Sequence, residues 1–258
     1  PELIGDDVYA DGVLILAYGD DPRSNGAYAG EDVADRLALR EGKHLDETLE
    51  AMRPAMKDGR IADGFVDALV QRACTIRMGD GLDPTSETGP LVSQAQLDKM
   101  HAYVASAKDE GAVLRCGGGR PDRDDLDPGG YFFSPTIFDH CDRSMTIVRD
   151  ETFGPILTVE RFDTEEQALA LGNDTSYGLA AGVRTSDAAL GERMVRGLRH
   201  GTVWLNDFGY YTPAAEWGGF GKSGNGRELG PTGLAEYQET KHIWHNTAPS
   251  ASRWFGPE

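Results

Sequence analysis

The fold of this chain is most tightly constrained by a regular alternation of short apolar runs and amphipathic runs in its second half. The apolar runs have the length and composition of strands, and the runs between them have helical spacing. Strands separated by helices of this length predict parallel crossovers, which are nearly always right-handed. The sequence therefore predicts an α/β domain on a parallel sheet. The expected elements are a strand at Pro155–Phe162, a helix at Thr164–Leu171, a strand at Leu179–Val183, a helix at Asp187–Leu198 and a strand at Thr202–Asn206.

Directly after the last of these strands, the chain enters an aromatic loop and then a turn crowded with glycine. Tyr210, Tyr211 and Trp217 lie in the loop, and six glycines lie between Gly218 and Gly230. Glycine allows backbone angles and close approaches that a Cβ atom would block. Strand, aromatic loop and glycine turn together predict one end of a substrate pocket.

Two phosphate-binding patterns are matched only in part by this turn. Gly219-Phe-Gly-Lys-Ser-Gly has the letters of a dinucleotide fingerprint, but no strand leads directly into it and more glycines follow where a helix should start. Gly221-Lys-Ser resembles the end of a P-loop, but Glu216 stands where that motif requires glycine. We therefore predict that the turn shapes the pocket and does not bind phosphate.

Overall charge and cysteine spacing exclude several classes of protein and site. The chain has 258 residues and a net charge of −18, so a nucleic acid or an anionic membrane would repel it. The apolar run Val13–Ala17 is too short for a signal core or a membrane span. Cys74, Cys116 and Cys141 lie far apart, without the spacing of a zinc site. These features predict a metal-free protein of the reducing cytoplasm.

The first half of the chain is predicted to form a buried strand followed by helices. Ser93 is placed to cap one helix, with Gln96 three residues later completing a capping box. The expected elements are a strand within Gly12–Gly19, helices at about 31–40 and 44–57, a helix over 61–73 and a helix at Gln94–Glu110.

Three stretches carry a resemblance to a known family. They are Gly79-Asp-Gly-Leu-Asp-Pro-Thr-Ser-Glu-Thr-Gly-Pro-Leu-Val-Ser, Asp150-Glu-Thr-Phe-Gly-Pro-Ile and the segment from Gly201 to His242. From about Ile61 to its end the chain resembles the aldehyde dehydrogenase superfamily, nearest its betaine-aldehyde and amino-aldehyde branch. The resemblance implies that family's C-terminal catalytic domain, a parallel-sheet α/β fold, over residues 61–236, and an oligomerisation strand over residues 237–258. Residues 1–60 would then be a short, unrelated segment.

The resemblance also implies roles for individual residues. Glu151 and Phe153 match the positions that contact the ribose and the nicotinamide of the cofactor, although Phe153 is equally consistent with a core residue. Tyr210, Tyr211, Glu216 and Trp217 match the wall that receives a cationic substrate tail. Relatives often carry His-Pro-Tyr where this chain has Gly209-Tyr210-Tyr211. The alternative is that the rings only close the core beneath the glycine turn.

The family's catalytic elements are missing from this sequence. Its nucleophilic cysteine, in a Gly-Gln-x-Cys setting, precedes the helix over residues 61–73, whereas no cysteine precedes Cys74 here. The Glu-Leu-Gly-Gly base motif and the Gly-Ser-Thr loop are also absent. Cys74 is predicted to be a small core residue of its helix. We therefore expect a truncated family member that lacks the NAD-binding domain, needs no cofactor and is not a self-sufficient dehydrogenase.

Three functions remain open at this point. The first is a repurposed enzyme with non-redox chemistry in the retained pocket, for which Asp20, Asp21, His44 and Asp207 are weak catalytic candidates. The sequence favours the alternative for His44, which is solvated helix surface. The second is a catalytically silent binding or scaffolding subunit that pairs with a full-length relative. The third is one half of a split dehydrogenase.

The expected partners are a small-molecule ligand and further copies of the chain. The extended segment at about Gln238–Asn246 carries Ile243 and Trp244, which an unpaired edge strand would leave exposed. We predict a homo-oligomer formed through this segment, with folding back onto the chain's own sheet as the alternative.

Overall fold

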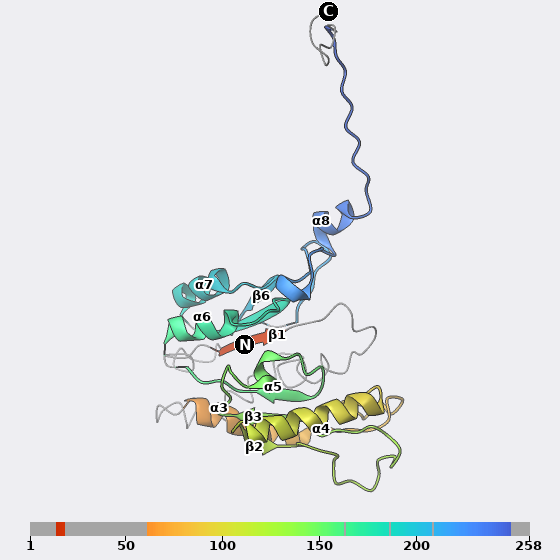
Figure 1. The fold of residues 1–258 in the computed structure, drawn as a ribbon, viewed down its shortest axis with the longest axis vertical. Coiled ribbons are helices and arrows are strands. Elements are labelled where there is room, and N and C mark those ends of the chain that lie inside the picture. Colours follow the sequence, from red (N-terminus) through yellow and green to blue (C-terminus); the bar gives the residue numbers. More distant parts are fainter. Residues whose placement is uncertain (1–13, 19–60, 163, 186, 208, 249–258) are drawn as a thin grey trace, which may run out of the picture.

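The computed structural model describes residues 14–18, 61–162, 164–185, 187–207 and 209–248 of the chain. These residues form two three-stranded sheets with helices packed against them (Figure 1). Among the described residues, no helix has both the length and the apolar character needed to span a membrane.

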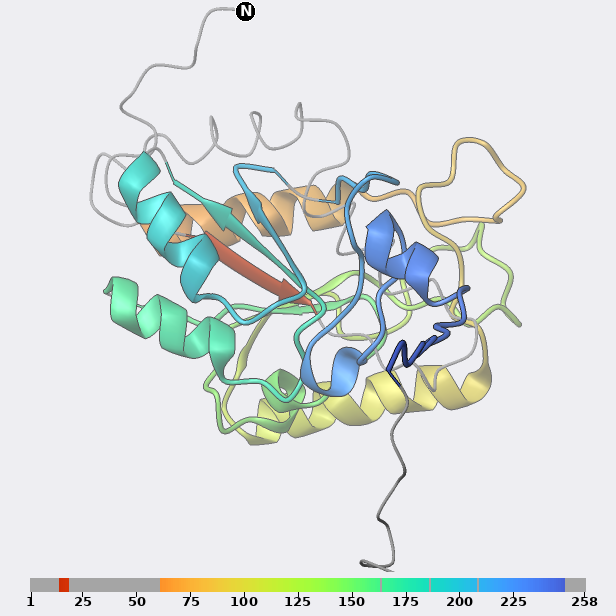
Figure 2. The same cartoon turned by 90° about the horizontal axis from the view of Figure 1, so that it is seen from above.

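The first sheet has the strand order β1-β5-β6. The central strand β5 (Ala180–Arg184) pairs antiparallel with β1 (Leu14–Tyr18) and parallel with β6 (Thr202–Leu205). Helices α6 (Glu165–Asn173) and α7 (Ala188–Gly197) lie side by side against it (Figure 2). Apolar side chains fill the space between helices and sheet; the buried ones are Ala168, Ala181, Val183, Met194 and Leu198.

The second sheet has the order β2-β3-β4 and lies between two helices. Strand β3 (Thr136–Asp139) pairs antiparallel with β2 (Val113–Cys116) and parallel with β4 (Ile156–Thr158). Successive side chains of a strand point to opposite faces. Accordingly, Ile137 packs with α3 (Ile61–Thr75) and Phe138 packs with α4 (Gln94–Asp109). The two helices therefore cover opposite faces, which explains why all four residues of β3 are buried.

The remaining elements are short. Helix α5 (Thr146–Arg149) leads toward β4, and the 3-10 turn η2 (Gly221–Ser223) and helix α8 (Gly230–Ala235) follow the aromatic loop. After α8, residues 237–248 run away from both sheets as an extended segment (Figure 1). No strand is assigned within this segment.

The predicted α/β class is confirmed, but the expectation of a parallel sheet is wrong in part. The crossover from β5 through α7 to β6 is parallel, as expected. Strands β4 and β5, which the alternation placed in one sheet, belong to different sheets. The reason is edge pairing: β1 occupies the remaining edge of β5, and the three residues of β4 pair with β3 instead. Both sheets are therefore mixed.

The segment over residues 1–60 contributes a described strand, β1, within the expected Gly12–Gly19. It pairs with β5 over five residue pairs, so this segment shares a sheet with the region resembling the family. The helices expected at residues 31–40 and 44–57 lie outside the described residues.

Candidate functional site

The turn that carries Glu151 and Phe153 is anchored to one face of α4. The Gln96 side-chain amide donates to the backbone carbonyls of Thr152 and Phe153, and Lys99 Nζ donates to the carbonyl of Glu151 at 3.1 Å. Residues three and four apart lie on the same helix face. The expected Ser93 cap is confirmed, because its side chain accepts from the Gln96 backbone N–H. The reciprocal half of the capping box is wrong, because the Gln96 amide binds this turn instead.

Close packing holds the same turn in an unusual conformation. Phe153 has a φ of 54°, in the left-handed region that non-glycine residues rarely adopt. A Cβ atom on the next residue, Gly154, would lie 2.1 Å from Met100 Sδ on α4. The Tyr103 hydroxyl donates to Asp150 Oδ2 at 3.3 Å. Burial, reinforced by this carboxylate, raises the pKa of Tyr103 to about 12, so the phenol stays a donor at neutral pH.

A side-chain bridge fixes the end of β6, where the aromatic loop begins. The Asn206 amide accepts from the Thr185 backbone N–H at 3.0 Å and donates to the Thr185 carbonyl at 2.9 Å. Asn206 itself has a φ of 56°, which asparagine tolerates better than most residues. The strand thus stops at a defined point and the chain turns into the loop. Asp207, the next residue, is exposed.

Three aromatic rings meet just beyond this point, and we call Trp204, Tyr211 and Trp217 the aromatic cluster. The ring centroids of Tyr211 and Trp217 are 4.5 Å apart, edge to face, and those of Trp204 and Tyr211 are 5.9 Å apart. Trp204 Nε1 donates to the carbonyl of Tyr210 at 3.0 Å, which ties the loop to β6. Trp204 is buried, whereas Tyr211 is 51% exposed. The cluster therefore offers aromatic surface to solvent from a fixed base.

Glu216 makes its contacts with α8. Its Oε1 accepts from the Thr232 hydroxyl at 3.0 Å and from the Thr232 backbone N–H at 3.4 Å. Its own backbone N–H and these Thr232 donors lower the pKa of Glu216. The carboxylate is thus ionised at neutral pH and helps to position α8 beside the cluster.

The glycine turn is closed by strand-like pairing and packs tightly against the start of β6. Trp217 and Glu228 exchange two backbone hydrogen bonds, each 2.7 Å long. A Cβ atom on Gly201 would lie 1.6 Å from the carbonyl oxygen of Gly218. Glycine is required at Gly201 because two backbone segments touch there.

The backbone donors that a phosphate loop would direct at an anion are already bonded within the chain. Phe220 N–H donates to the Gly178 carbonyl at 2.9 Å, and Lys222 N–H donates to the Ser176 carbonyl at 2.9 Å. The Lys-Ser pair lies in the single turn η2 and does not open a long helix. The described residues 219–224 therefore fit a packing turn and do not fit a pyrophosphate cradle.

The catalytic candidates are not brought together by the described structure. Asp20, Asp21 and His44 lie outside the described residues, and Asp207 is exposed at the end of β6. In the part of the chain that the structure describes, no group of three or more His, Cys, Asp or Glu side chains is arranged to hold a metal ion. The expectation that Cys74 is a core residue is wrong, because Cys74 is exposed at the edge of the buried stripe of α3.

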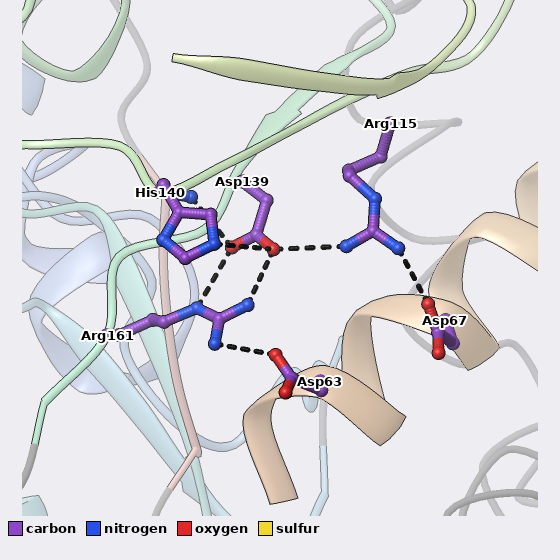
Figure 3. A network of polar contacts seen from close by, with 6 residues as sticks. All are labelled: Asp63, Asp67, Arg115, Asp139, His140 and Arg161. Atoms are coloured by element: carbon purple, nitrogen blue, oxygen red, sulfur yellow. Dashed lines mark hydrogen bonds and ion pairs between the residues drawn. The ribbon is translucent and has the colours of Figure 1, made fainter. Parts of the chain in front are cut away.

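Sequence reasoning missed an ionic network around a buried carboxylate at the end of β3 (Figure 3). The Asp139 side chain is fully buried and accepts from Arg161 Nε at 3.1 Å, from Arg161 Nη2 at 2.6 Å and from Arg115 Nη1 at 3.1 Å. Burial alone would raise the pKa of Asp139, but hydrogen bonds from Arg161 and from the His140 backbone N–H hold it below its ordinary value. The carboxylate is therefore ionised and fully paired.

The same arginines extend the network to α3. Arg161 Nη1 lies 2.7 Å from Asp63 Oδ1, and Arg115 Nη2 lies 2.7 Å from Asp67 Oδ1 (Figure 3). We define these four residues, together with Asp139, as the α3 ionic seam: Asp63, Asp67, Arg115, Asp139 and Arg161. Its members are up to 98 positions apart, so no local sequence pattern announces it. Trp204 was missed for another reason, because its place on β6 marked it only as an apolar strand residue.

Comparison with known proteins places these observations in a family. The profile described as the aldehyde dehydrogenase family matches residues 53–243. A betaine aldehyde dehydrogenase of Bacillus subtilis (strain 168) is 45% identical over 212 residues, which cover 82% of this chain and 43% of that protein. A betaine aldehyde dehydrogenase of Brucella anthropi is 44% identical over 71% of this chain and 38% of its own length.

A solved structure agrees with this. The betaine aldehyde dehydrogenase of Staphylococcus aureus, crystallised in complex with NAD+, superposes with a TM-score of 0.72 at 48% identity. The match covers 76% of this chain and 39% of that one. The chain thus spans about two fifths of the length of the relatives it matches.

Proposed function

The chain belongs to the aldehyde dehydrogenase family, and from this premise we propose that it binds a small cationic ligand at the aromatic cluster without oxidising it by itself. The observation that carries the proposal is the meeting of Trp204, Tyr211 and Trp217 at the end of β6. Aromatic faces attract a quaternary ammonium group through their quadrupole. Betaine aldehyde, named in the relatives, carries such a group.

The loop provides the rest of the ligand wall. Tyr210 and Tyr211 are exposed beside the buried Trp204, and the Trp204–Tyr210 hydrogen bond limits their movement. Gly209 has a φ of 75°, a conformation that glycine adopts without strain. Glu216 supports the wall indirectly, by holding α8 through Thr232.

The state of the thiols supports the proposal that the chain does not oxidise the ligand by itself. An aldehyde dehydrogenase attacks its substrate with a cysteine thiolate. Burial raises the pKa of Cys141 to about 11, and burial followed by contact with Cys74 raises that of Cys116 to about 11. Both thiols stay protonated at neutral pH. Cys74 is exposed on α3, and its thiol contributes to the raised pKa of Cys116.

Cofactor binding is proposed to be weak for the same chain. Glu151 and Phe153 would contact the ribose and the nicotinamide, the end of NAD at which hydride is exchanged. The donors of the glycine turn that might have held the pyrophosphate are bonded to Gly178 and Ser176. We therefore propose that these two residues alone do not hold a dinucleotide tightly.

A non-redox reaction in the same pocket is the second candidate function. It is favoured by Asp207, an exposed carboxylate that directly follows Asn206 at the end of β6. Asp20, Asp21 and His44 remain candidates on the sequence alone. The scaffold and split-enzyme alternatives are favoured by the exposed segment over residues 237–248, which is available for pairing with a second chain.

Calorimetry with a matched ligand pair tests the proposed binding. Choline and its neutral isostere 3,3-dimethylbutan-1-ol have almost the same shape and differ in the positive charge. We expect choline to bind about 2- to 30-fold more tightly, the equivalent of roughly 0.5–2 kcal/mol of cation–π attraction. Trp217→Ala should abolish this preference, Trp217→Phe should keep most of it, and Tyr237→Ala, on the exposed segment, should leave it unchanged. Equal affinities for both ligands would contradict the proposal.

Titration with NAD and NADP gives a separate prediction. We expect no dissociation constant in the low micromolar range, because residues 61–162, 164–185, 187–207 and 209–248 offer proposed contacts to only one end of the dinucleotide. Aldehyde-dependent formation of NADH by the purified chain, followed at 340 nm, would show that this prediction is wrong. This outcome is independent of the choline titration.

A further inference from the structure

We propose that Cys74 and Cys116 form an oxidative modification site, in which peroxide converts the two thiols to a disulfide that joins α3 to β2. Cys74 is exposed and Cys116 is half-buried on the neighbouring strand. Cys116 packs against the cluster that contains Ala73, the residue before Cys74, and the nearby Cys74 thiol contributes to raising the pKa of Cys116. This pair takes no part in the proposed ligand binding, so the inference is independent of it.

The position of Cys74 on α3 follows from helical periodicity. The buried stripe of α3 contains Val66, Leu69 and Ala73, at spacings of three and four residues. Cys74 follows Asp63 by eleven residues, which correspond to about three full helical turns. It is therefore offset from the buried stripe toward the flank of α3 that carries Asp63 and Asp67. Both aspartates bind arginines of the β2-β3-β4 region. The flank that carries Cys74 is therefore held against the sheet.

An irregularity in β2 aims Cys116 at the same flank. Leu114 pairs with Phe138 and Cys116 pairs with the adjacent Ile137, so Arg115 is an extra residue in the ladder. Such a bulge redirects the side chains beside it, which would otherwise alternate between the two faces. Arg115 reaches Asp67 on α3, and Cys116 packs against the cluster of Leu69, Ala73 and Ile76. Consecutive residues of β2 thus both meet α3.

The ionic seam holds the two cysteines in register before any bond forms. Asp67–Arg115 and Asp63–Arg161 connect α3 to β2 and to the chain after β4, and Asp139 binds both arginines (Figure 3). Cys74 is the last residue but one of α3. A helix end adjusts its backbone more easily than a helix interior. The ion pairs therefore fix the position of α3, while the backbone at the end of the helix can adjust enough for the two sulfur atoms to approach.

The reaction uses peroxide as its only oxidant. The exposed Cys74 sulfur takes one oxygen atom from hydrogen peroxide, giving a sulfenic acid and one water molecule. Cys116 then loses its proton and its thiolate attacks the Cys74 sulfur, so that the S–S bond forms and the S–O bond breaks, and the leaving hydroxide takes up a proton to become a second water. Two thiols are oxidised and one peroxide is reduced to two waters. Cys141 is buried in the core beside α4 and does not compete.

Peptide mass spectrometry tests the inference directly. The full chain is treated with hydrogen peroxide, free thiols are blocked with iodoacetamide, and the protein is digested with trypsin without reduction. Trypsin releases Cys74 within residues 73–77, Cys116 within residues 116–123 and Cys141 within residues 124–143. We expect the first two peptides joined, at a mass two hydrogens below their sum, in wild type and in Cys141→Ser. Cys74→Ser should lack this species.

Thermal unfolding supplies a second, independent readout. A disulfide that closes the loop from Cys74 to Cys116 restricts the unfolded chain, so the oxidised protein should melt roughly 5–15 °C higher than the reduced protein. Cys74→Ser and Cys116→Ser should lose this difference, and either variant suffices if the other does not fold. Recovery of Cys74 only as sulfinic acid or in intermolecular disulfides would overturn the proposal.

Discussion

At the scale of single residues, Asp139 illustrates how a buried charge becomes a structural element. The carboxylate has no exposed surface and receives three hydrogen bonds from two arginines. An ion without partners in such a place would be strongly destabilising, whereas a fully paired one is tolerated. The network it organises joins β3, β2, the chain after β4 and α3 (Figure 3).

Replacing this carboxylate should therefore be costly. We expect Asp139→Ala to lower the free energy of unfolding by roughly 2–4 kcal/mol, because Arg115 and Arg161 lose their shared partner. Asp63→Ala, which removes an exposed partner of Arg161, should cost less than about 1 kcal/mol. Urea denaturation at pH 7 measures both values. If Asp139→Ala and Asp63→Ala lowered the free energy of unfolding equally, the burial of Asp139 would not explain its contribution to stability.

The pH dependence of the Asp139 effect has a defined sign. The pKa of Asp139 is lowered in the folded state, so its stabilisation is fully present above its ordinary pKa of about 3.9 and is lost as the pH falls toward the folded value. The gap between wild type and Asp139→Ala should thus narrow below pH 4.

His200 presents the opposite problem at the residue scale. Its side chain is 5% exposed, and neither ring nitrogen has a hydrogen-bond partner among the described residues. Burial lowers the pKa of His200, so the folded protein keeps the ring neutral. Because the unfolded chain binds a proton more readily, stability is lost as the pH falls through about 6.5 toward the folded pKa.

An apolar substitution isolates this contribution. We expect His200→Leu to raise the free energy of unfolding at pH 7.5 by about 1–2 kcal/mol, since it removes buried polar atoms that lack partners. Its advantage over wild type should grow between pH 7.5 and 5.5. Thermal melts at the two pH values provide the comparison, and parallel pH profiles for the two proteins would contradict the assignment.

At the scale of elements, the glycine turn packs its backbone directly against the backbone at the start of β6. The glycines of these two segments differ in how much the packing depends on them. A Cβ atom at Gly201 would collide with the Gly218 carbonyl at 1.6 Å, whereas a Cβ atom at Gly226 would meet nothing within 4 Å. Backbone atoms cannot rotate away as a side chain can. Gly201 is therefore required by the packing, whereas Gly226, one of the six glycines of the turn, is not.

These two positions form a matched pair. Gly201→Ala should destabilise the chain by about 2–3 kcal/mol through overpacking, and it should also weaken choline binding by displacing Trp217. Gly226→Ala should change the stability by less than about 0.5 kcal/mol. Differential scanning calorimetry distinguishes the two outcomes. Similar melting temperatures for both variants would show that the turn relaxes more freely than its contacts indicate.

At the scale of the whole molecule, the exposed segment over residues 237–248 stands out from the rest of the described chain. Ile243 is 78% exposed and Trp244 is 81% exposed, and the segment runs away from both sheets (Figure 1). Extended backbone with unpaired polar groups and apolar side chains pairs readily with another chain. We therefore predict self-association through this segment.

Light scattering checks the prediction on the intact chain. At tens of micromolar the measured mass should exceed the 27.9 kDa of one copy. The double variant Ile243→Glu/Trp244→Glu should have a measured mass closer to that of one copy. Leu82 is also an exposed apolar residue but lies in the loop between α3 and α4, so Leu82→Glu should leave the mass unchanged. A wild type that stays at the mass of one copy would refute the idea.

Much of the local structure could be predicted from the sequence because its causes are local. Hydrophobic periodicity marked α4, α6, α7, β5 and β6 to within a few residues, and side-chain chemistry marked Ser93 at the start of α4. The family also followed from short motifs, since the same backbone turns demand the same residues. Local steric and hydrogen-bonding rules act within about one turn of helix, so the sequence by itself determined these features.

Only the tertiary structure decided which strands share a sheet and which distant side chains meet. Strand pairing depends on which edges are already occupied, and that is why β4 joined β3 and β1 took the edge of β5. The ionic seam, the Cys74–Cys116 contact and the turn of Gln96 toward Phe153 all join positions far apart in the chain. Charges and thiols carry no sequence mark of their partners, because the partner is chosen by packing and burial once the elements have assembled.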